Sequence, residues 1–259
     1  MTSLCDPSEP EAFRIVNGAG AGRVVLVCDH ASNRVPRRLG TLGLTPSQLD
    51  DHIAWDPGAE QVAQGLAQQL DAPLILSSFS RLVIDCNRPL GHPNSIAMIS
   101  DGVTIPGNVN LSSDERRVRA TTLFQPYHDA IDGLLSQRSG HACCLLSIHS
   151  FTPILDGQVR PWPVGVSHWD DPISARLMCN ALADRGVGPV GNNEPYPITE
   201  TIDYTIPVHT RKHKIPALMI EIRNDGLCTP LASTVWANHI AAAYLSLEEW
   251  LLQDDIGHR

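Results

Sequence analysis

Short apolar runs recur along the chain, and polar or turn-forming residues bound most of them. In the first of these runs, Val24–Cys28, every position is apolar. A run of this length and character is typical of a strand that is buried on both faces. Buried strands are therefore predicted over residues 23–29, 72–80, 81–87, 141–150, 164–168 and 217–225.

Stretches with apolar residues at helical spacing lie between these runs. The pair Asp56-Pro57 suits the N-cap and the first position of a helix, and apolar residues then recur at helical spacing over residues 59–70. Further helices are expected after Thr45-Pro46 and over residues 112–139, 173–186 and 234–253.

The alternation of strands and helices predicts an α/β fold, with three α/β/α layers around a mostly parallel, mixed sheet. We expect a single domain over residues 1–259, with a loosely ordered N-terminal segment over residues 1–20. Residues 88–110 are rich in Pro, Gly and Asn, and loops of this length are usually functional or disordered. Because ligands bind beyond the carboxyl ends of the strands in such sheets, the residues that follow each strand are the candidate site residues.

The composition is that of an ordinary globular protein, with 42% hydrophobic and 18% charged residues. The formal net charge of −9 argues against nucleic acid or an anionic membrane surface as the main partner, although local arginines can still bind a small anion. The N-terminal residues lack the basic and apolar regions of a signal peptide, and no apolar run reaches the roughly 18–20 residues of a membrane span. We therefore expect a cytoplasmic protein that acts on a small molecule.

The seven cysteines are scattered, and no pair has CxxC spacing. This pattern predicts reduced, buried thiols rather than a disulfide framework or a structural zinc site of that kind. Cys28 and Cys86 lie near candidate site segments, but we expect both to pack as small hydrophobic residues.

Two histidines follow buried apolar runs at their carboxyl ends, His30 in VCDHAS and His149 in SIHSF. Together with an aspartate at a helix start they suggest a metal site, because catalytic zinc commonly takes three His or Asp/Glu ligands and keeps one position for water. We propose His30, Asp56 and His149 as the ligands of one divalent ion. His52 and Asn33 compete with Asp56, which equally suits a helix N-cap without any metal.

Two other carboxylates lie in or beside apolar strands. Asp29 is adjacent to His30, so its side chain should point to the opposite face of the strand and is not a ligand candidate. Glu221 lies inside LMIEIRND, where a buried carboxylate is costly unless it is paired or used. It either forms a salt bridge with Arg223, two positions on, or takes a proton from an attacking water molecule.

The segment RLVIDCNR carries groups suited to a carboxylate substrate. Arg81 begins it, and Asn87 and Arg88 end it. Arginine binds a carboxylate through two parallel hydrogen bonds, so these residues are candidates for holding an acidic substrate. His209 in DYTIPVHT is a further candidate for contact with the substrate or the transition state. The chain has no GxGxxG, Walker or GxSxG motif, which disfavours nucleotide-binding and serine-hydrolase functions.

Seven segments carry a family resemblance, and they follow one another from about residue 24 to residue 225. They are VCDHASNRVP, HIAWDPGA, FSRLVIDCNRP, SIHSFTP, NNEPY, DYTIPVH and MIEIRND. Together they resemble the N-formylglutamate amidohydrolase family. The resemblance implies hydrolysis of the amide bond of N-formyl-L-glutamate, or of a close N-acyl acidic amino acid, with formate and L-glutamate as the products in the first case.

That family is in turn similar to the zinc carboxypeptidase and aspartoacylase-type hydrolases, which implies a phosphorylase/hydrolase-like fold and Zn²⁺ as the cofactor. By this resemblance IDCNRP supplies Asn87 and Arg88 to hold the substrate carboxylate. SIHSF supplies His149 as a metal ligand, and IEIRND supplies Glu221 as the catalytic glutamate.

The chain departs from those hydrolases at the first ligand pair, where they use His-x-x-Glu. Asn33 stands at the position of the glutamate, three residues after His30. An insertion between the strand and the next helix would move the carboxylate ligand to Asp56.

The expected partner is a small anionic N-acyl amino acid. Glu221 would activate water for attack on the formyl carbon and later protonate the leaving amine. The alternatives are a hydrolase of another N-acyl amino acid or of a short peptide, and a binding relative without activity. The substrate-binding candidates are Arg81, Asn87, Arg88, His209 and Arg223.

Overall fold

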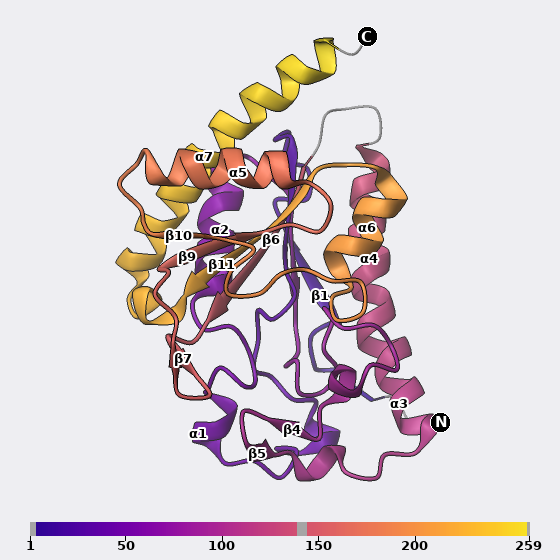
Figure 1. The fold of residues 1–259 in the computed structure, drawn as a ribbon. Coiled ribbons are helices and arrows are strands. Elements are labelled where there is room, and N and C mark those ends of the chain that lie inside the picture. The colour runs from indigo at the N-terminus through magenta and orange to yellow at the C-terminus, as the bar shows by residue number, and fades with distance from the viewer. Residues whose placement is uncertain (1–3, 139–143, 258–259) are drawn as a thin grey trace.

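A computed structural model describes residues 4–138 and 144–257 of the chain (Figure 1). A seven-stranded sheet with the order β1-β3-β2-β6-β11-β9-β10 forms its centre. The strands β3, β2, β6 and β11 run parallel, β1 is antiparallel to β3, and β9 and β10 run antiparallel to β11. The strands are β1 Phe13–Val16, β2 Val24–Cys28, β3 Leu74–Ser77, β6 Cys144–Phe151, β9 Val164–Ser167, β10 Val190–Asn192 and β11 Ala217–Arg223. Two short hairpins pair β4 Ile99–Ser100 with β5 Val103–Thr104, and β7 Ile154–Leu155 with β8 Gln158–Val159.

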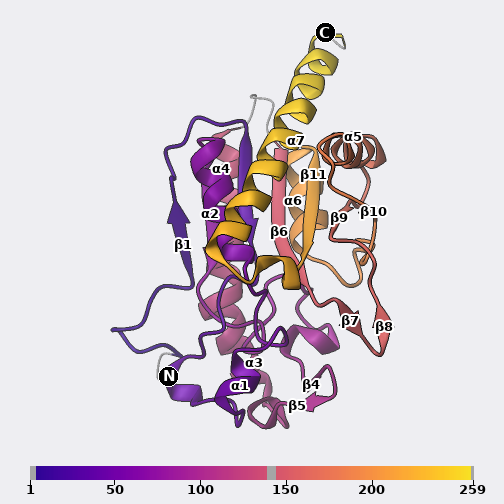
Figure 2. The same cartoon turned by 90° about the vertical axis from the view of Figure 1, so that its left-hand side faces the viewer.

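Helices cover both faces of this sheet, so the predicted mostly parallel, mixed α/β fold is confirmed. Figures 1 and 2 show α2, α5 and α7 on one face and α4 and α6 on the other. The helices are α1 Pro46–Leu49, α2 Ala59–Gln69, α3 Ser113–Arg119, α4 Gln125–Gln137, α5 Pro172–Ala183, α6 Thr205–His213 and α7 Pro230–Gly257. A π-helical segment, Ala120–Phe124, joins α3 to α4, and 3-10 turns lie at Arg37–Leu39, Pro93–Ile96, Pro106–Asn108 and Asn224–Leu227.

Two buried clusters, one on each face of the sheet, explain why the strand sequences are apolar at every position. Alternate residues of a strand point to opposite faces. On the α2/α7 face Leu26 packs with Leu146, whereas Val25, Leu145 and Met219 pack under α4 and α6.

The predicted strand over residues 81–87 is wrong. These residues form turns. Their apolar side chains enter a third buried cluster beyond the carboxyl ends of the parallel strands, where Leu82, Val83 and Ile84 lie with Ile105 and Phe124. The apolar side chains of residues 81–87 are therefore buried, as predicted. They pack against loops and the α3/α4 region, however, and not against neighbouring strands.

The helix expected to begin at Asp56-Pro57 begins later, at Ala59. Gly58 caps it with a φ of 83°, and a Cβ at this position would lie 2.5 Å from Leu227 Cβ. Glycine is the residue that adopts this conformation without steric cost. The Asp56 side chain consequently does not cap α2 and is available for other contacts.

The strand β1 lies within residues 1–20, for which we expected loose order, and it pairs with β3. The helical region predicted over residues 112–139 is observed over residues 113–137 as α3, the π-helical segment and α4, and residue 139 lies outside the described residues. A capping box of Ser112 and Glu115 begins α3. Within the described part of the chain, no helix is both long enough and apolar enough to cross a bilayer.

Arg119 anchors the loops that carry much of the site. Its buried guanidinium donates to Val83 O at 2.9 Å, to Asn108 Oδ1 at 2.7 Å and to Gly107 O at 3.2 Å. Asn108 in turn donates to the carbonyls of Leu82 and Ala97. A single buried cation therefore joins the turns of residues 81–87 to residues 97–108.

We expect Arg119→Met to lower the free energy of unfolding by about 2–4 kcal/mol, because three acceptors, two of them fully buried, lose their donor. Urea unfolding measures this change. The matched control is Arg116→Met on the exposed part of the same helix, which should change stability by less than about 0.5 kcal/mol. Equal effects of the two substitutions would contradict an anchoring role.

Candidate active site

A cavity of roughly 280 Å³ opens beyond the carboxyl ends of β2, β6 and β11, where the strand order predicted a site. Its lining includes His30, Asp56, His149 and Glu221. These side chains come from the ends of β2, β6 and β11 and from the turn before α2, and all are at most 5% exposed. The structure thus brings together residues that lie up to 191 positions apart in the chain.

Asp56 lies between the two histidines. Its Oδ2 is 2.8 Å from His149 Nδ1 and 3.4 Å from His30 Nδ1, and it also accepts from the Ser150 backbone N–H at 3.2 Å. The Asp56 N–H donates to His30 O, which fixes the turn before α2 against the end of β2. Of the three residues that competed for the carboxylate position, Asp56 is the one that meets both histidines.

Each histidine turns its other ring nitrogen toward a second carboxylate. His30 Nε2 is 2.7 Å from Asp85 Oδ1, and His149 Nε2 is 3.0 Å from Asp29 Oδ2. The result is a buried chain of alternating carboxylates and imidazoles, Asp85–His30–Asp56–His149–Asp29. From the sequence we expected the Asp29 side chain on the opposite face of the strand, and we assigned no role to Asp85. Neither aspartate lines the cavity, but Asp85 contacts His30 and Asp29 contacts His149.

The position of Asp29 depends on both helices of one face. Its Oδ1 accepts from Tyr127 Oη on α4 at 3.0 Å and from Thr205 Oγ1 on α6 at 2.7 Å, while Ser147 Oγ donates to its Oδ2. Burial alone would raise the pKa of Asp29, but the hydrogen bond and the charge of His149 hold its pKa below the usual range. Asp29 is therefore a fixed, negatively charged acceptor for His149.

Arg81 balances the same group of carboxylates. Its guanidinium donates to Asp85 Oδ2 at 2.8 Å and to Asp56 Oδ1 at 3.4 Å. Burial opposes ionisation of Asp85, but the Arg81 and His30 charges hold its pKa well below the ordinary value. Arg81 is consequently engaged with protein carboxylates, although it also lines the cavity.

The arrangement fits a divalent metal ion. His30, Asp56 and His149 each offer one ligand atom, and these atoms lie within 4.8 Å of one another. Imidazole and carboxylate donors suit zinc. Metal-binding histidines characteristically donate their second N–H to a carboxylate or carbonyl, as Asp85 and Asp29 allow here. We infer from this donor set that the three residues suit a resident metal ion.

Glu221 lies next to His149 because β6 and β11 are parallel and place these two residues in register. The salt bridge to Arg223 does not form, since Arg223 donates to Asp225 and to the Arg160 carbonyl. Glu221 Oε2 is buried and has no hydrogen-bond partner among the described residues. Burial raises the pKa of Glu221 to about 7, with the Asp56 carboxylate acting in the same direction and the His149 charge opposing it.

Arg88 and Asn87 lie at another wall of the cavity, next to Asp203. Both donate to Asp203 Oδ1, Asn87 at 3.2 Å and Arg88 at 3.3 Å. Asn87 Oδ1 accepts from the backbone N–H groups of Tyr204 and Thr205, so this side chain is fully engaged at the start of α6. Arg88 Nε is buried without a partner among the described residues, which leaves it a free donor.

Four residues singled out in the sequence have other contacts. Asn33 donates to Leu49 O and Asp50. His52 lines the cavity, but its ring contacts Asp51 and Asp101. Arg223 and His209 are not among the residues that line the cavity. The His209 ring contacts His128 between α6 and α4. Burial lowers the pKa of His209 to about 3 and that of His128 to about 4.

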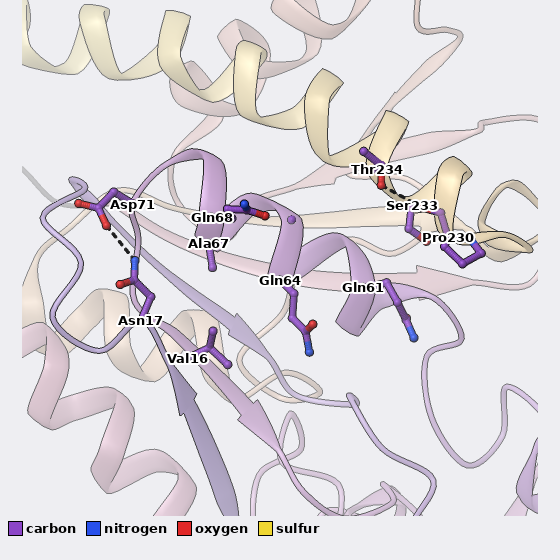
Figure 3. A pocket seen from close by; sticks show the side chains of 11 residues that line it. Val16, Asn17, Gln61, Gln64, Ala67, Gln68, Asp71, Pro230, Ser233 and Thr234 are labelled. Carbon is purple, nitrogen blue, oxygen red and sulfur yellow. Dashed lines mark hydrogen bonds between the residues drawn. The ribbon is translucent and has the colours of Figure 1, made fainter.

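A larger groove of roughly 670 Å³ lies between β1, α2 and the start of α7 (Figure 3). Glutamines of α2 and the start of α7 line it, and Asn17 donates to Asp71 at its edge. Asp71 is the ionisable side chain among its lining residues, and the Asn17 and Ala21 hydrogen bonds lower its pKa. The described residues that line the groove include this one carboxylate and no histidine or cysteine, so the smaller cavity, which gathers histidines and carboxylates, is the candidate active site.

Comparisons with known proteins found a matching family model and similar crystal structures. The model of the N-formylglutamate amidohydrolase family matches residues 22–228. The chain is similar to the crystal structure of a gene product from Agrobacterium tumefaciens, with a TM-score of 0.91 and 34% identity over 95% of this chain and 98% of that chain. It also resembles N-formylglutamate amidohydrolase from Ralstonia eutropha JMP134, with a TM-score of 0.68 and 17% identity over 93% of this chain and 98% of that chain. No match was found among curated proteins.

The raised pKa of Glu221 predicts a pH-dependent loss of stability in the metal-free protein. The folded pKa of about 7 exceeds the ordinary value of 4.5, so this group's contribution is full below pH 4.5 and is lost as the pH rises through 7. Between pH 5 and pH 8 the wild type should lose on the order of 2 kcal/mol more unfolding free energy than Glu221→Gln, which stays neutral. Urea unfolding of both proteins at both pH values measures the difference. Parallel losses in the two proteins would contradict a buried carboxyl with a raised pKa.

Proposed function

Since the chain belongs to the N-formylglutamate amidohydrolase family and is therefore an amidohydrolase, we propose that it hydrolyses N-formyl-L-glutamate, or a close N-acyl acidic amino acid. With N-formyl-L-glutamate the products are formate and L-glutamate. In this proposal the whole chain acts as one amidohydrolase domain, because the cavity residues extend from His30 to Glu221.

The observation that carries the proposal is the position of Glu221. A buried carboxyl with a pKa of about 7, whose Oε2 has no hydrogen-bond partner among the described residues, stands beside a two-histidine, one-aspartate donor set in a cavity that Arg88 also lines. A general acid–base group works best when its pKa lies near the operating pH. This combination suits hydrolysis of an amide on an anionic molecule.

His30, Asp56 and His149 would hold the cofactor, which we propose to be Zn²⁺. When bound, Zn²⁺ would polarise the amide carbonyl and lower the pKa of a water molecule. Asp85 and Asp29 keep the histidine rings oriented through hydrogen bonds at 2.7 Å and 3.0 Å. These buried contacts already restrict the rotation of both imidazoles, so each ring would lose little further rotational freedom when the metal binds.

Glu221 would move the proton during the reaction. Its Oε2 accepts a proton from the attacking water as the oxygen bonds to the formyl carbon. The same carboxyl then donates that proton to the nitrogen of the leaving amine as the C–N bond breaks. Because Glu221 lies on a central strand beside His149, its carboxyl is held in place rather than carried by a mobile loop.

Arg88 would recognise a carboxylate of the substrate. Asp203 fixes one end of its guanidinium, and the free Nε can donate to the ligand. Asn87 maintains this arrangement by tying Asp203 to the start of α6. Arg81 contributes positive charge to the cavity lining but is engaged with Asp56 and Asp85.

Purified protein with Zn²⁺ should release formate from N-formyl-L-glutamate, and Glu221→Gln should lower kcat by about 10²- to 10⁴-fold, the range typical of a lost acid–base group. An enzyme-coupled formate assay measures the rate. N-acetyl- and N-succinyl-L-glutamate, assayed in parallel, identify the acyl group. A wild-type protein that binds zinc but hydrolyses none of the three would exclude this function and favour a binding relative.

We expect Arg88→Met to raise KM for the acidic substrate by about 10- to 100-fold, the loss of one charge-assisted contact. Arg38→Met, on an exposed turn away from the cavity, is the control and should leave KM unchanged. A fall in kcat with an unchanged KM would assign Arg88 to the reacting groups rather than to carboxylate binding.

A further inference from the structure

A second group of titratable side chains lies between α4 and α6, outside the cavity. His128 and Asp132 are one turn apart on α4, and His209 and His213 are one turn apart on α6. His128 contacts His209, and Asp132 contacts His213, so the two pairs face each other across the helix interface. The proposed amidohydrolase reaction uses none of them.

A relay of hydrogen bonds fixes which nitrogen of His209 carries the proton. His128 Nε2 lies 2.8 Å from the Cys86 carbonyl, which can only accept, so His128 donates from this atom. A neutral imidazole has one N–H, and His128 Nδ1 is therefore an acceptor. It accepts from His209 Nε2 at 3.1 Å, which leaves His209 Nδ1 without a proton.

The bare Nδ1 of His209 has no hydrogen-bond partner among the described residues, although the side chain is 2% exposed. A buried, unpaired lone pair is costly unless a donor or a metal ion occupies it. Histidine ligands of metals characteristically show this arrangement, with one N–H held by a hydrogen bond and the other nitrogen free.

Two further ligands lie next to His209. Asp132, His209 and His213 each offer one ligand atom, and these atoms lie within 4.8 Å of one another. Two histidines at i and i+4 lie on one face of a helix, which is the spacing that zinc-binding helices use. His213 Nε2 and Asp132 Oδ1 are already 2.8 Å apart.

We propose that Asp132, His209 and His213 form a second divalent-cation site, selective for zinc-like ions, that joins α4 to α6. Two imidazoles and one carboxylate make the ligand set, and the partly exposed positions of Asp132 and His213 leave the fourth position to water.

Lys212 is the competitor for this site. Its ammonium group lies 2.7 Å from Asp132 Oδ1, the same atom that His213 contacts. The Lys212 side chain is 60% exposed, so it can move into solvent when a cation binds. This contact provides a control. If Asp132 is a metal ligand, removing the lysine should strengthen zinc binding. If Asp132 serves only as the ion-pair partner of Lys212, removing the lysine should not strengthen it.

The site would act on the active site through α6. Thr205, the first residue of α6, contacts one residue of the cavity lining and one residue that orients a cavity histidine, since its N–H donates to Asn87 and its hydroxyl donates to Asp29. A metal ion one helix-length away would fix α6 against α4, which carries Tyr127, the other donor to Asp29. The role is structural.

The test is the zinc content of the full-length protein after equilibrium dialysis against Zn²⁺, determined by elemental analysis for the wild type, His213→Gln and Lys212→Gln. We expect His213→Gln to hold one zinc fewer per chain than the wild type, whatever number the wild type holds. Lys212→Gln should keep the wild-type number and bind the last zinc more tightly. Added Zn²⁺ should also raise the unfolding temperature of His213→Gln less than that of the wild type.

Equal zinc content in the wild type and His213→Gln would overturn the proposal, as would a loss in Lys212→Gln equal to that in His213→Gln. Circular dichroism checks the folding of each variant. Asp132→Asn, which keeps the shape of the side chain, is the second variant and should show the same loss of one zinc. The zinc content per chain does not depend on hydrolysis, so this test remains valid even if the protein does not catalyse the proposed reaction.

Discussion

The candidate site depends on one buried chain of alternating charges, from Asp85 through His30, Asp56 and His149 to Asp29. Three buried carboxylates are stable only with matching positive charge, which Arg81 and the two imidazoles supply. Burial opposes a positive His149, yet Asp29 and Asp56 raise its pKa well above the ordinary value. A divalent ion would bring the same two positive charges as a pair of protonated imidazoles. Binding of a metal ion at this site would therefore replace protons as the carriers of positive charge and release them, with little change in the net charge of the site.

The sheet and the loops each supply residues of this buried chain of charges. The strands fix His149 and Glu221 side by side, because β6 and β11 are parallel and in register. The turns of residues 81–87, held by Arg119, bring Asp85 to His30 from outside the sheet. The strands thus carry Glu221 and His149, whereas the turns of residues 81–87 and the residue that follows them supply Asp85 and Arg88.

Much of this could be predicted from local sequence, and the errors have physical causes. Apolar runs predicted β2, β3, β6, β9 and β11, since burial on both faces leaves a clear signal. Residues 81–87 have the same signal but pack under loops, which a run of apolar residues cannot reveal. Asp56 was singled out at a helix start, yet the helix begins at Ala59 and the carboxylate turns to the histidines. Asp29 and Asp85 were missed as partners because their contacts join segments that are distant in the chain. The roles of the site residues remain proposals.

The register between β6 and β11 also limits how this protein can change during evolution. A single inserted or deleted residue in either strand would turn Glu221 or His149 to the other face of the sheet, where α2 and α7 pack. The loop that carries Arg88 is not constrained in this way. Its ends are fixed at a few points, and its length does not determine the face of the sheet to which a strand residue points. Changes in the length of this loop would therefore leave Glu221 and His149 side by side on their strands.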